Sequence, residues 1–147
     1  MKLGMTTAVC LLAMSGLSAQ APAGAWPQFR GSANLVGTTQ ATLPAQLKVQ
    51  WTYEAGDAID SSAAIVDGVV YVGSANGELH AVNLADGKPK WKYTASVDGI
   101  GESSPTVGHG LVFVGDLAGV FHAVDVNTGK ATWTFKTGSE IKSSPVV

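Results

Sequence analysis

The chain of 147 residues is poor in cysteine and in charge. Its single cysteine, Cys10, can form neither an internal disulfide bond nor a cysteine-rich zinc site. Charged residues make up 14% of the sequence, against ~25% in a typical soluble domain, and the net charge is −2 without any basic run. Because a nucleic-acid-binding surface needs clustered Lys and Arg, this composition argues against a nucleic-acid partner.

Long hydrophobic runs are also missing. The most apolar stretch, residues 8–14, is shorter than the ~20 residues that a membrane-spanning helix needs. It follows a basic residue and precedes small residues with A-x-A patterns at Ala19–Ala21 and Ala23–Ala25. This order predicts that residues 1–25 are a secretory signal peptide, and that the protein is periplasmic or secreted without a membrane span. Cys10 lies inside the apolar stretch rather than after it, which argues against a lipoprotein.

Internal similarity is what the chain does have. Residues 61–98 and 103–140 align at a constant offset of 42, with 13 of 38 positions identical and no gap. The identical positions include four glycines, a histidine and a tryptophan in each copy, and another copy begins at residues 141–145. A period of about 40–50 residues with a recurring tryptophan is typical of β-propeller blades.

Each copy predicts four short strands. In the first copy these are residues 62–66, 69–74, 78–84 and 90–95, joined by turns at Asp67-Gly68, Asn76-Gly77 and Asp86-Gly87. Glycine suits such turns because it accepts positive φ angles. The continuous apolar runs at residues 69–72 and 111–114 predict strands that are covered on both faces. The sequence therefore predicts an all-β protein built of four-stranded antiparallel blades.

The same pattern predicts how the blades pack. Each copy pairs a small residue, Ala81 or Ala123, with a large one, Trp91 or Trp133. We expect each tryptophan to pack against its alanine and to bury its ring area between blades.

A motif in each copy resembles the tryptophan-docking motif of PQQ-type β-propeller repeats, which occur in quinoprotein dehydrogenases and in BamB-like proteins. It reads Ala-x-Asn-x3-Gly-x3-Trp at residues 81–91 and Ala-x-Asp-x3-Gly-x3-Trp at residues 123–133. The Ser-Ser-Pro opening of the later copies and Trp-Pro-Gln-Phe-Arg-Gly at residues 26–31 are similar to this family as well. The resemblance covers residues 26–147 and implies a ring of eight blades. The motif itself is structural and does not mark PQQ binding.

These features predict the domain organisation. We expect a signal peptide at 1–25, an N-terminal segment at 26–46 and a partial propeller at 47–147, which comprises an outer closing strand (47–58), two blades (59–99 and 100–140) and the start of another blade (141–147). Trp51 and Tyr53 match Trp91 and Tyr93, so residues 47–58 are predicted to close the ring as the outer strand of the last blade. A closed propeller ring has ~4–8 blades, so two blades cannot form one. We therefore expect an N-terminal fragment of a longer propeller, with the remaining blades in cis.

Two histidines occupy one repeat position, His80 and His122, which raises the possibility of a metal pair. Neither a third histidine nor a cysteine lies at a matching spacing, so both are predicted to be packing residues and no metal site is assigned. His109 is predicted to lie in a solvated turn. Asp116 stands where the first copy has Ser74 and is interpreted as turn variation.

Asp60, Glu102 and Lys142 precede the innermost strands of successive copies and are predicted to line the rim of the central channel. In propeller enzymes of this family such openings can supply cofactor or calcium ligands. One carboxylate per blade is not an assembled site, so we expect a solvated polar rim. The segment with Trp26, Phe29 and Arg30 is either a partner-binding tag or, as we expect, a segment that packs on the propeller.

The resemblance implies two main functions. The favoured one is a noncatalytic exported scaffold or protein-interaction module of the BamB class, with protein partners and no cofactor. The alternative is the N-terminal fragment of a quinoprotein dehydrogenase that oxidises an alcohol or a sugar with PQQ and calcium. No catalytic residues are recognisable, because neither a Ser-His-Asp arrangement nor a nucleophile elbow is present. A propeller attached to another domain is a third possibility.

Overall fold

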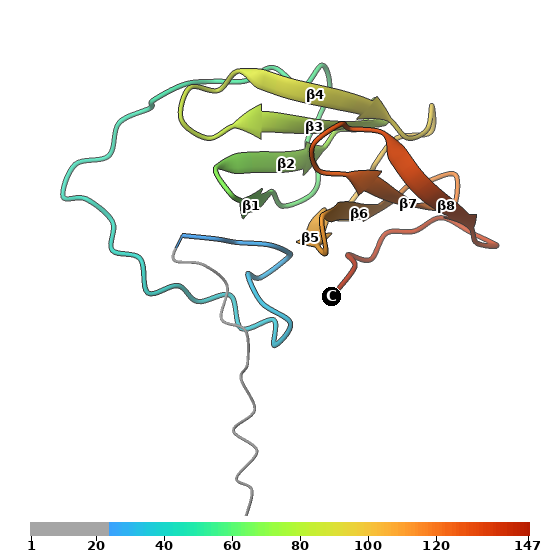
Figure 1. The fold of residues 1–147 in the computed structure, drawn as a ribbon, viewed down its shortest axis with the longest axis horizontal. Coiled ribbons are helices and arrows are strands. Elements are labelled where there is room, and N and C mark those ends of the chain that lie inside the picture. Colours follow the sequence, from blue (N-terminus) through green and yellow to red (C-terminus); the bar gives the residue numbers. More distant parts are fainter. Residues whose placement is uncertain (1–23) are drawn as a thin grey trace, which may run out of the picture.

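The computed structural model describes residues 24–147, which form eight β-strands and no helix (Figure 1). The strands make two antiparallel sheets with the orders β1-β2-β3-β4 and β5-β6-β7-β8. The predicted all-β architecture of four-stranded blades is confirmed, and the sheets are called blade 1 and blade 2 below. All but the last two residues of the predicted signal peptide, including Cys10, lie outside the described residues. Within residues 24–147 no helix is long and apolar enough to cross a membrane.

The strands are short and lie within two residues of their predicted ends. Blade 1 comprises β1 (Ala64–Val66), β2 (Val69–Gly73), β3 (Glu78–Asn83) and β4 (Pro89–Thr94). Blade 2 comprises β5 (Thr106–Gly108), β6 (Leu111–Gly115), β7 (Val120–Asp125) and β8 (Ala131–Lys136). In the ladders Ala81 pairs with Trp91, and Ala123 pairs with Trp133. The predicted alanine–tryptophan pairs are therefore confirmed as cross-strand neighbours. The expected burial of the ring between blades does not hold for Trp133, which is 44% exposed because no described blade covers it.

The first hairpin of each blade closes as the sequence predicts. Asp67 and Gly68 have φ angles of 50° and 72°, and His109 and Gly110 have φ angles of 52° and 77°. Two consecutive residues with positive φ are the signature of the two-residue type I′ turn, which matches the twist of the flanking strands. His109 is exposed at this turn, as predicted.

The core lies between the two blades. Tyr71, Leu79 and Ala81 of blade 1 belong to one buried cluster with Val112 and Val114 of blade 2. Ile100, on the connection between the blades, is fully buried in the same cluster. At about 25 cal/mol for each Å² of apolar surface buried, this shared cluster makes the two blades stabilise one another.

The N-terminal segment packs along the inner strands of both blades, as predicted. The backbones of Trp26 and Ile65 exchange two hydrogen bonds, with N–O distances of 2.7 and 2.8 Å. The carbonyl oxygen of Pro27 accepts a hydrogen bond from the Val107 amide of β5 at 2.8 Å. This segment therefore contacts the innermost strand of each sheet.

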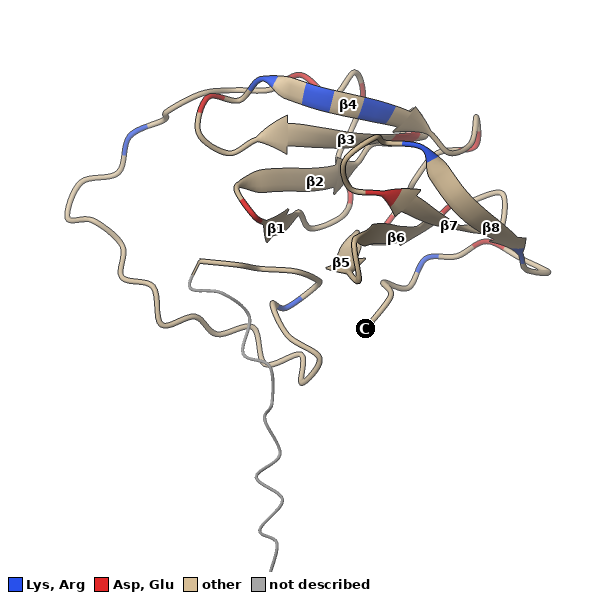
Figure 2. Ribbon diagram, in the orientation of Figure 1, with Lys and Arg blue, Asp and Glu red and all other residues tan. Residues whose placement is uncertain are grey.

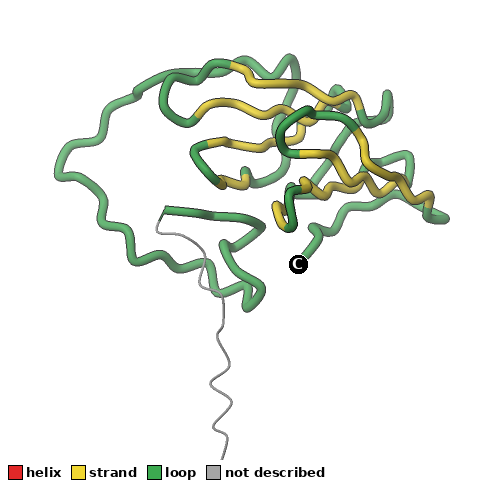
Figure 3. The backbone as a smooth tube through the Cα atoms, viewed as in Figure 1, coloured by secondary structure: helices red, strands yellow, loops and turns green. Residues whose placement is uncertain are grey.

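The predicted outer strand at residues 47–58 does not form a strand. Figure 3 shows strands only in the two blades, and the long connection that leads into β1 is a loop. A strand needs a neighbour to pair its backbone groups, and none of the described residues pairs with this segment along its length. The segment is instead held on blade 1 by contacts at its C-terminal end.

Candidate functional site

The strongest candidate site is the junction between consecutive blades, where one tryptophan docks on the next blade. Trp91 lies on the outer strand of blade 1, and its indole N–H donates to the carbonyl oxygen of Val126 in blade 2 at 2.9 Å. Its ring lies over Gly129, where a Cβ atom would be 2.7 Å from the ring and φ is +67°. This glycine is required both by the close approach of the ring and by its backbone conformation.

The segment before blade 1 repeats this junction. The indole N–H of Trp51 donates to the carbonyl oxygen of Leu84 at 2.8 Å, and the ring covers Gly87. Although it forms no strand, the segment therefore docks on blade 1 as β4 docks on blade 2. Trp133, on β8 of blade 2, is the third tryptophan of the series and is 44% exposed.

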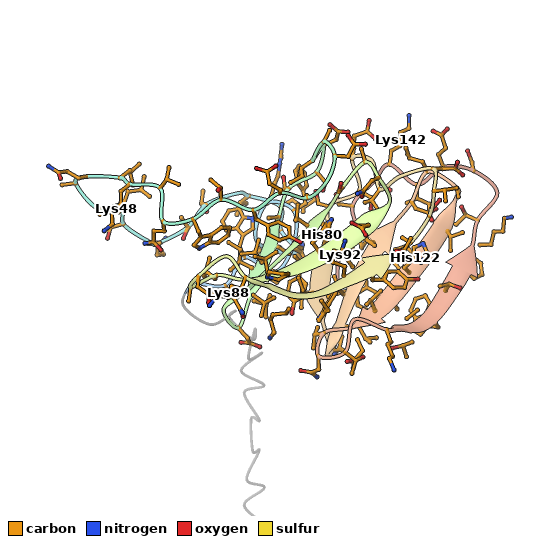
Figure 4. All side chains as sticks on the ribbon, turned by 90° about the horizontal axis from the view of Figure 1, so that it is seen from above. Lys48, His80, Lys88, Lys92, His122 and Lys142 are labelled. Carbon is orange, nitrogen blue, oxygen red and sulfur yellow. The ribbon has the colours of Figure 1, made fainter. Side chains whose placement is uncertain are left out.

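A tyrosine and a histidine form the second contact of each junction. The hydroxyl of Tyr93 lies 3.0 Å from Nδ1 of His122, and the hydroxyl of Tyr53 lies 3.0 Å from Nδ1 of His80. In both pairs the ring centroids are 5.6 Å apart with an edge-on geometry. The histidines are 1% and 2% exposed and come from matching strands of the two blades (Figure 4). Their predicted role as buried packing residues is confirmed, with a hydrogen bond added to each.

The interpretation of Asp116 as mere turn variation is wrong. Asp116 is fully buried, and its Oδ2 atom lies 2.9 Å from Nε2 of His122. Its Oδ1 atom accepts the amide hydrogen of Val120 at 2.7 Å. Tyr93, His122 and Asp116 therefore form a hydrogen-bonded chain that links blade 1 to blade 2. Two of its groups come from the β6–β7 region and one from the preceding blade, so no local sequence pattern identified it.

The corresponding chain in blade 1 is incomplete. Ser74 replaces the aspartate and donates its hydroxyl to the carbonyl oxygen of Ala55 at 3.2 Å. Nε2 of His80 is buried without a hydrogen-bond partner among the described residues. The nearest carboxylate oxygen, of Glu78, is 3.7 Å away. Burial is the largest influence on the His80 pKa and lowers it, although the charge of Glu78 acts in the opposite direction.

Glu78 forms its ion pair with Lys92. Both of its carboxylate oxygens contact Nζ of Lys92, at 2.9 and 3.0 Å, and this hydrogen bond lowers the pKa of Glu78. Figure 2 shows the basic residues on β4, the outer strand that carries Lys92. The ion pair is therefore a surface feature beside His80 and not a replacement for the aspartate of blade 2.

The paired serines connect the blades near their inner strands. The amide of Ser62 donates to the hydroxyl oxygen of Ser104 at 3.0 Å, and the amide of Ser104 donates to that of Ser144 at 2.9 Å. Ser104 and Ser144 thus each accept a backbone hydrogen bond from the copy before. Thr106 adds a hydrogen bond of 2.6 Å to the carbonyl oxygen of Pro145. The recurring serines serve the assembly of the blades.

The three predicted rim residues line one hollow, as expected. Asp60, Glu102 and Lys142 surround a cavity of about 450 Å³ together with Phe29 and Leu35 of the N-terminal segment. The ammonium group of Lys142 pairs with Glu140 at 3.3 Å and not with a rim carboxylate. Among residues 24–147 no three His, Cys, Asp or Glu side chains are placed to hold a metal ion. Calcium takes about six to eight oxygen ligands, so the carboxylates present here do not fit a calcium–PQQ site.

The repeated docking of one four-stranded sheet on the next defines consecutive blades of a β-propeller. Residues 37–146 match the family whose description is outer membrane protein assembly factor BamB, a family of PQQ-like repeats. The match covers most of the chain, and the chain belongs to this family. No curated protein matches the chain at a significant level.

Solved structures show the same fold. The quinohemoprotein alcohol dehydrogenase from Comamonas testosteroni superimposes with a TM-score of 0.74 at 23% identity, over 84% of this chain and 22% of that one. BamB from Moraxella catarrhalis gives a TM-score of 0.53 at 24% identity, over 60% of this chain and 27% of that one. The chain therefore spans only about a quarter of the length of either protein. At these identities the likeness establishes the propeller fold and not a shared activity.

Proposed function

We propose that the chain is part of an exported, noncatalytic propeller that serves as a scaffold for protein partners. The observation that carries this proposal is that the buried histidines and the buried aspartate, which could have formed a reactive or metal-binding site, take part in packing contacts instead. His80 and His122 face the tyrosines of the blade junctions, and Asp116 is buried against His122. All three lie in contacts that hold blades together.

The rim supports the same proposal. The N-terminal segment pairs with β1 and β5, and its side chains Phe29 and Leu35 line the hollow beside Asp60 and Glu102. One wall of this hollow is thus formed by the N-terminal segment of the chain itself. Membership of a family described as an outer membrane protein assembly factor favours a protein as the partner.

The alternative is the N-terminal part of a PQQ-dependent dehydrogenase. It is favoured by the structural match to a quinohemoprotein alcohol dehydrogenase, which has the higher TM-score of the two natural proteins described above. The residues described here do not supply the ligands for PQQ and calcium, so this alternative requires a site built elsewhere in a longer chain.

Reconstitution distinguishes the two functions. The product of the complete gene is titrated with PQQ and Ca²⁺, and heat stability and dye-linked oxidation of a panel of alcohols and sugars are measured. If the propeller is a scaffold, we expect neither a stoichiometric rise in Tm nor turnover. Saturable binding of one PQQ per chain with substrate-dependent dye reduction would establish the dehydrogenase and overturn the scaffold.

Export to the periplasm or the medium is the second part of the proposal. It is supported by the order of features in residues 1–25. Intact-mass measurement of the protein recovered from the periplasmic and cytoplasmic fractions of a Gram-negative host tests it. We expect a periplasmic product that begins after Ala21 or Ala25. Recovery of the full-length chain from the cytoplasm alone would contradict export.

A further inference from the structure

The two tryptophan junctions of this chain are built to the same plan and differ in one buried group. Trp51 and Trp91 donate to a carbonyl oxygen at 2.8 and 2.9 Å, and each junction has a Tyr–His contact of 3.0 Å. At the junction of blade 1 with blade 2, Asp116 accepts from the histidine. At the junction of the 47–58 segment with blade 1, the matching position is Ser74, and Nε2 of His80 makes no hydrogen bond to any of the described residues.

We propose that the junction of the 47–58 segment with blade 1 is a proton-sensitive latch centred on His80, which opens in mild acid while the junction between the blades stays closed. The segment is predicted to close the propeller ring, so the latch lies at the expected seam of the ring. The proposal concerns how the ring opens or assembles and does not depend on whether the propeller is a scaffold or an enzyme.

The surroundings of His80 determine how it responds to a proton. The titratable or charged groups on the elements packed around it are Tyr53 and Glu54 of the segment, Glu78 of β3, and Lys90 and Lys92 of β4. Tyr53 contacts Nδ1, and Glu78 is held by Lys92 and lies 3.7 Å from Nε2. A proton added to this buried ring therefore gains no hydrogen-bonded carboxylate, since the nearest one is shared with Lys92, and the charge must be taken out of water, which is costly.

The second histidine provides the internal comparison. Protonated His122 would keep its Nε2–H on the carboxyl group of Asp116 at 2.9 Å, and this hydrogen bond would become charge-assisted. Protonation thus leaves this junction with a satisfied donor. Protonated His80 instead carries an Nε2–H for which the described residues provide no hydrogen-bond partner.

The direction of the pH effect follows from burial. Burial lowers the pKa of folded His80 below its ordinary value of about 6.5, so the neutral ring is the form that the closed junction favours. The contribution of this neutral ring to the closed state is complete above about pH 6.5. It is lost as the pH falls below that value towards the pKa of the folded state. Release of the segment returns the imidazole to water and lets it accept the proton.

Protonation of His80 can detach the 47–58 segment from blade 1. The segment pairs in no β-ladder with the described residues, which hold it through Trp51, Tyr53 and the carbonyl oxygens of Ala55 and Ala58. The released segment would expose the apolar groove that it lines together with Val70, Val72 and Val82, a cavity of about 560 Å³. The latch therefore controls whether this groove is covered.

The indole N–H groups report the two junctions separately. Hydrogen exchange of the Trp51 and Trp91 indoles is followed by NMR in the full chain from pH 8 to pH 5, with correction for intrinsic exchange. We expect the protection of Trp51 to fall at least tenfold more than that of Trp91 between pH 7 and pH 5. Equal losses at both junctions, or no loss at Trp51, would overturn the latch.

Variants at the histidine and at the aspartate or serine position test whether His80 causes the pH dependence. Ser74→Asp copies the carboxylate of blade 2 and should make the protection of Trp51 independent of pH within about twofold. His80→Phe removes the titrating ring and should have the same effect. Asp116→Ser should transfer the pH sensitivity to Trp91. If Asp116→Ser fails to fold, the first two variants decide, and a pH dependence of Trp51 that persists in both refutes the role of His80.

Discussion

Replacing Trp91 by alanine is expected to lower the free energy of unfolding by about 3 kcal/mol, the low end of the range for large-to-small changes at aromatic core positions. The substitution removes the ring that covers Gly129 and the indole hydrogen bond to Val126. It thereby leaves a cavity between the blades and a carbonyl group without its donor. Urea denaturation of the chain, followed by circular dichroism, measures the effect.

Trp133 provides the matched control for this variant. It has the same repeat position and the same cross-strand alanine, but its side chain is 44% exposed and makes no indole hydrogen bond among the described residues. Trp133→Ala is therefore expected to lower the free energy of unfolding by only about 1 kcal/mol, because it removes the ring contacts with Phe113 and Phe121. Equal losses for the two variants would show that docking on the next blade contributes little to stability.

Replacing Asp116 by alanine is expected to cost about 3 kcal/mol, because removal of one partner from a buried pair leaves the other unsatisfied. The variant would leave Nε2 of His122 and the amide of Val120 without their acceptors inside the core. The midpoint of urea unfolding at pH 7.5 measures this loss.

Two further variants separate the hydrogen bonds from the charge. Asp116→Asn keeps an oxygen acceptor and should recover part of the lost stability. Glu140→Gln alters an exposed carboxylate that pairs with Lys142 at 3.3 Å, and it should leave the midpoint unchanged because such surface pairs contribute little. An Asp116→Ala protein as stable as the unmodified chain would mean that the Tyr–His–Asp chain has no structural importance.

The repeat made most of the fold predictable. Strand limits, hairpin turns and the Ala–Trp pairs depend on residues close in sequence or directly opposite in a ladder. Asp67-Gly68 and His109-Gly110 illustrate this, because a turn with two positive φ angles restricts the residues that can form it. The expected strand at residues 47–58 did not form because a strand also needs a partner, which no local pattern supplies.

The candidate site was only partly predictable. Burial of His80 and His122 followed from their shared repeat position, and the rim residues followed from the alignment of strand openings. The role of Asp116 did not, because the other copy has Ser74 at that position and an aspartate in a turn usually faces water. The Ser62–Ser104 hydrogen bond joins two residues that are 42 positions apart in the sequence, so local patterns did not predict it either.

The sequence by itself determined that this protein is built of PQQ-like propeller blades, because the glycine turns, apolar strands and tryptophan motif recur at a fixed offset. Only the tertiary structure decided which blade each tryptophan docks on and which histidine receives a carboxylate. The physical reason is that these contacts depend on which groups the fold brings together, and the spacing of residues in the sequence does not reveal that. In a buried site, the presence or absence of a single hydrogen-bond partner then has a large effect on stability.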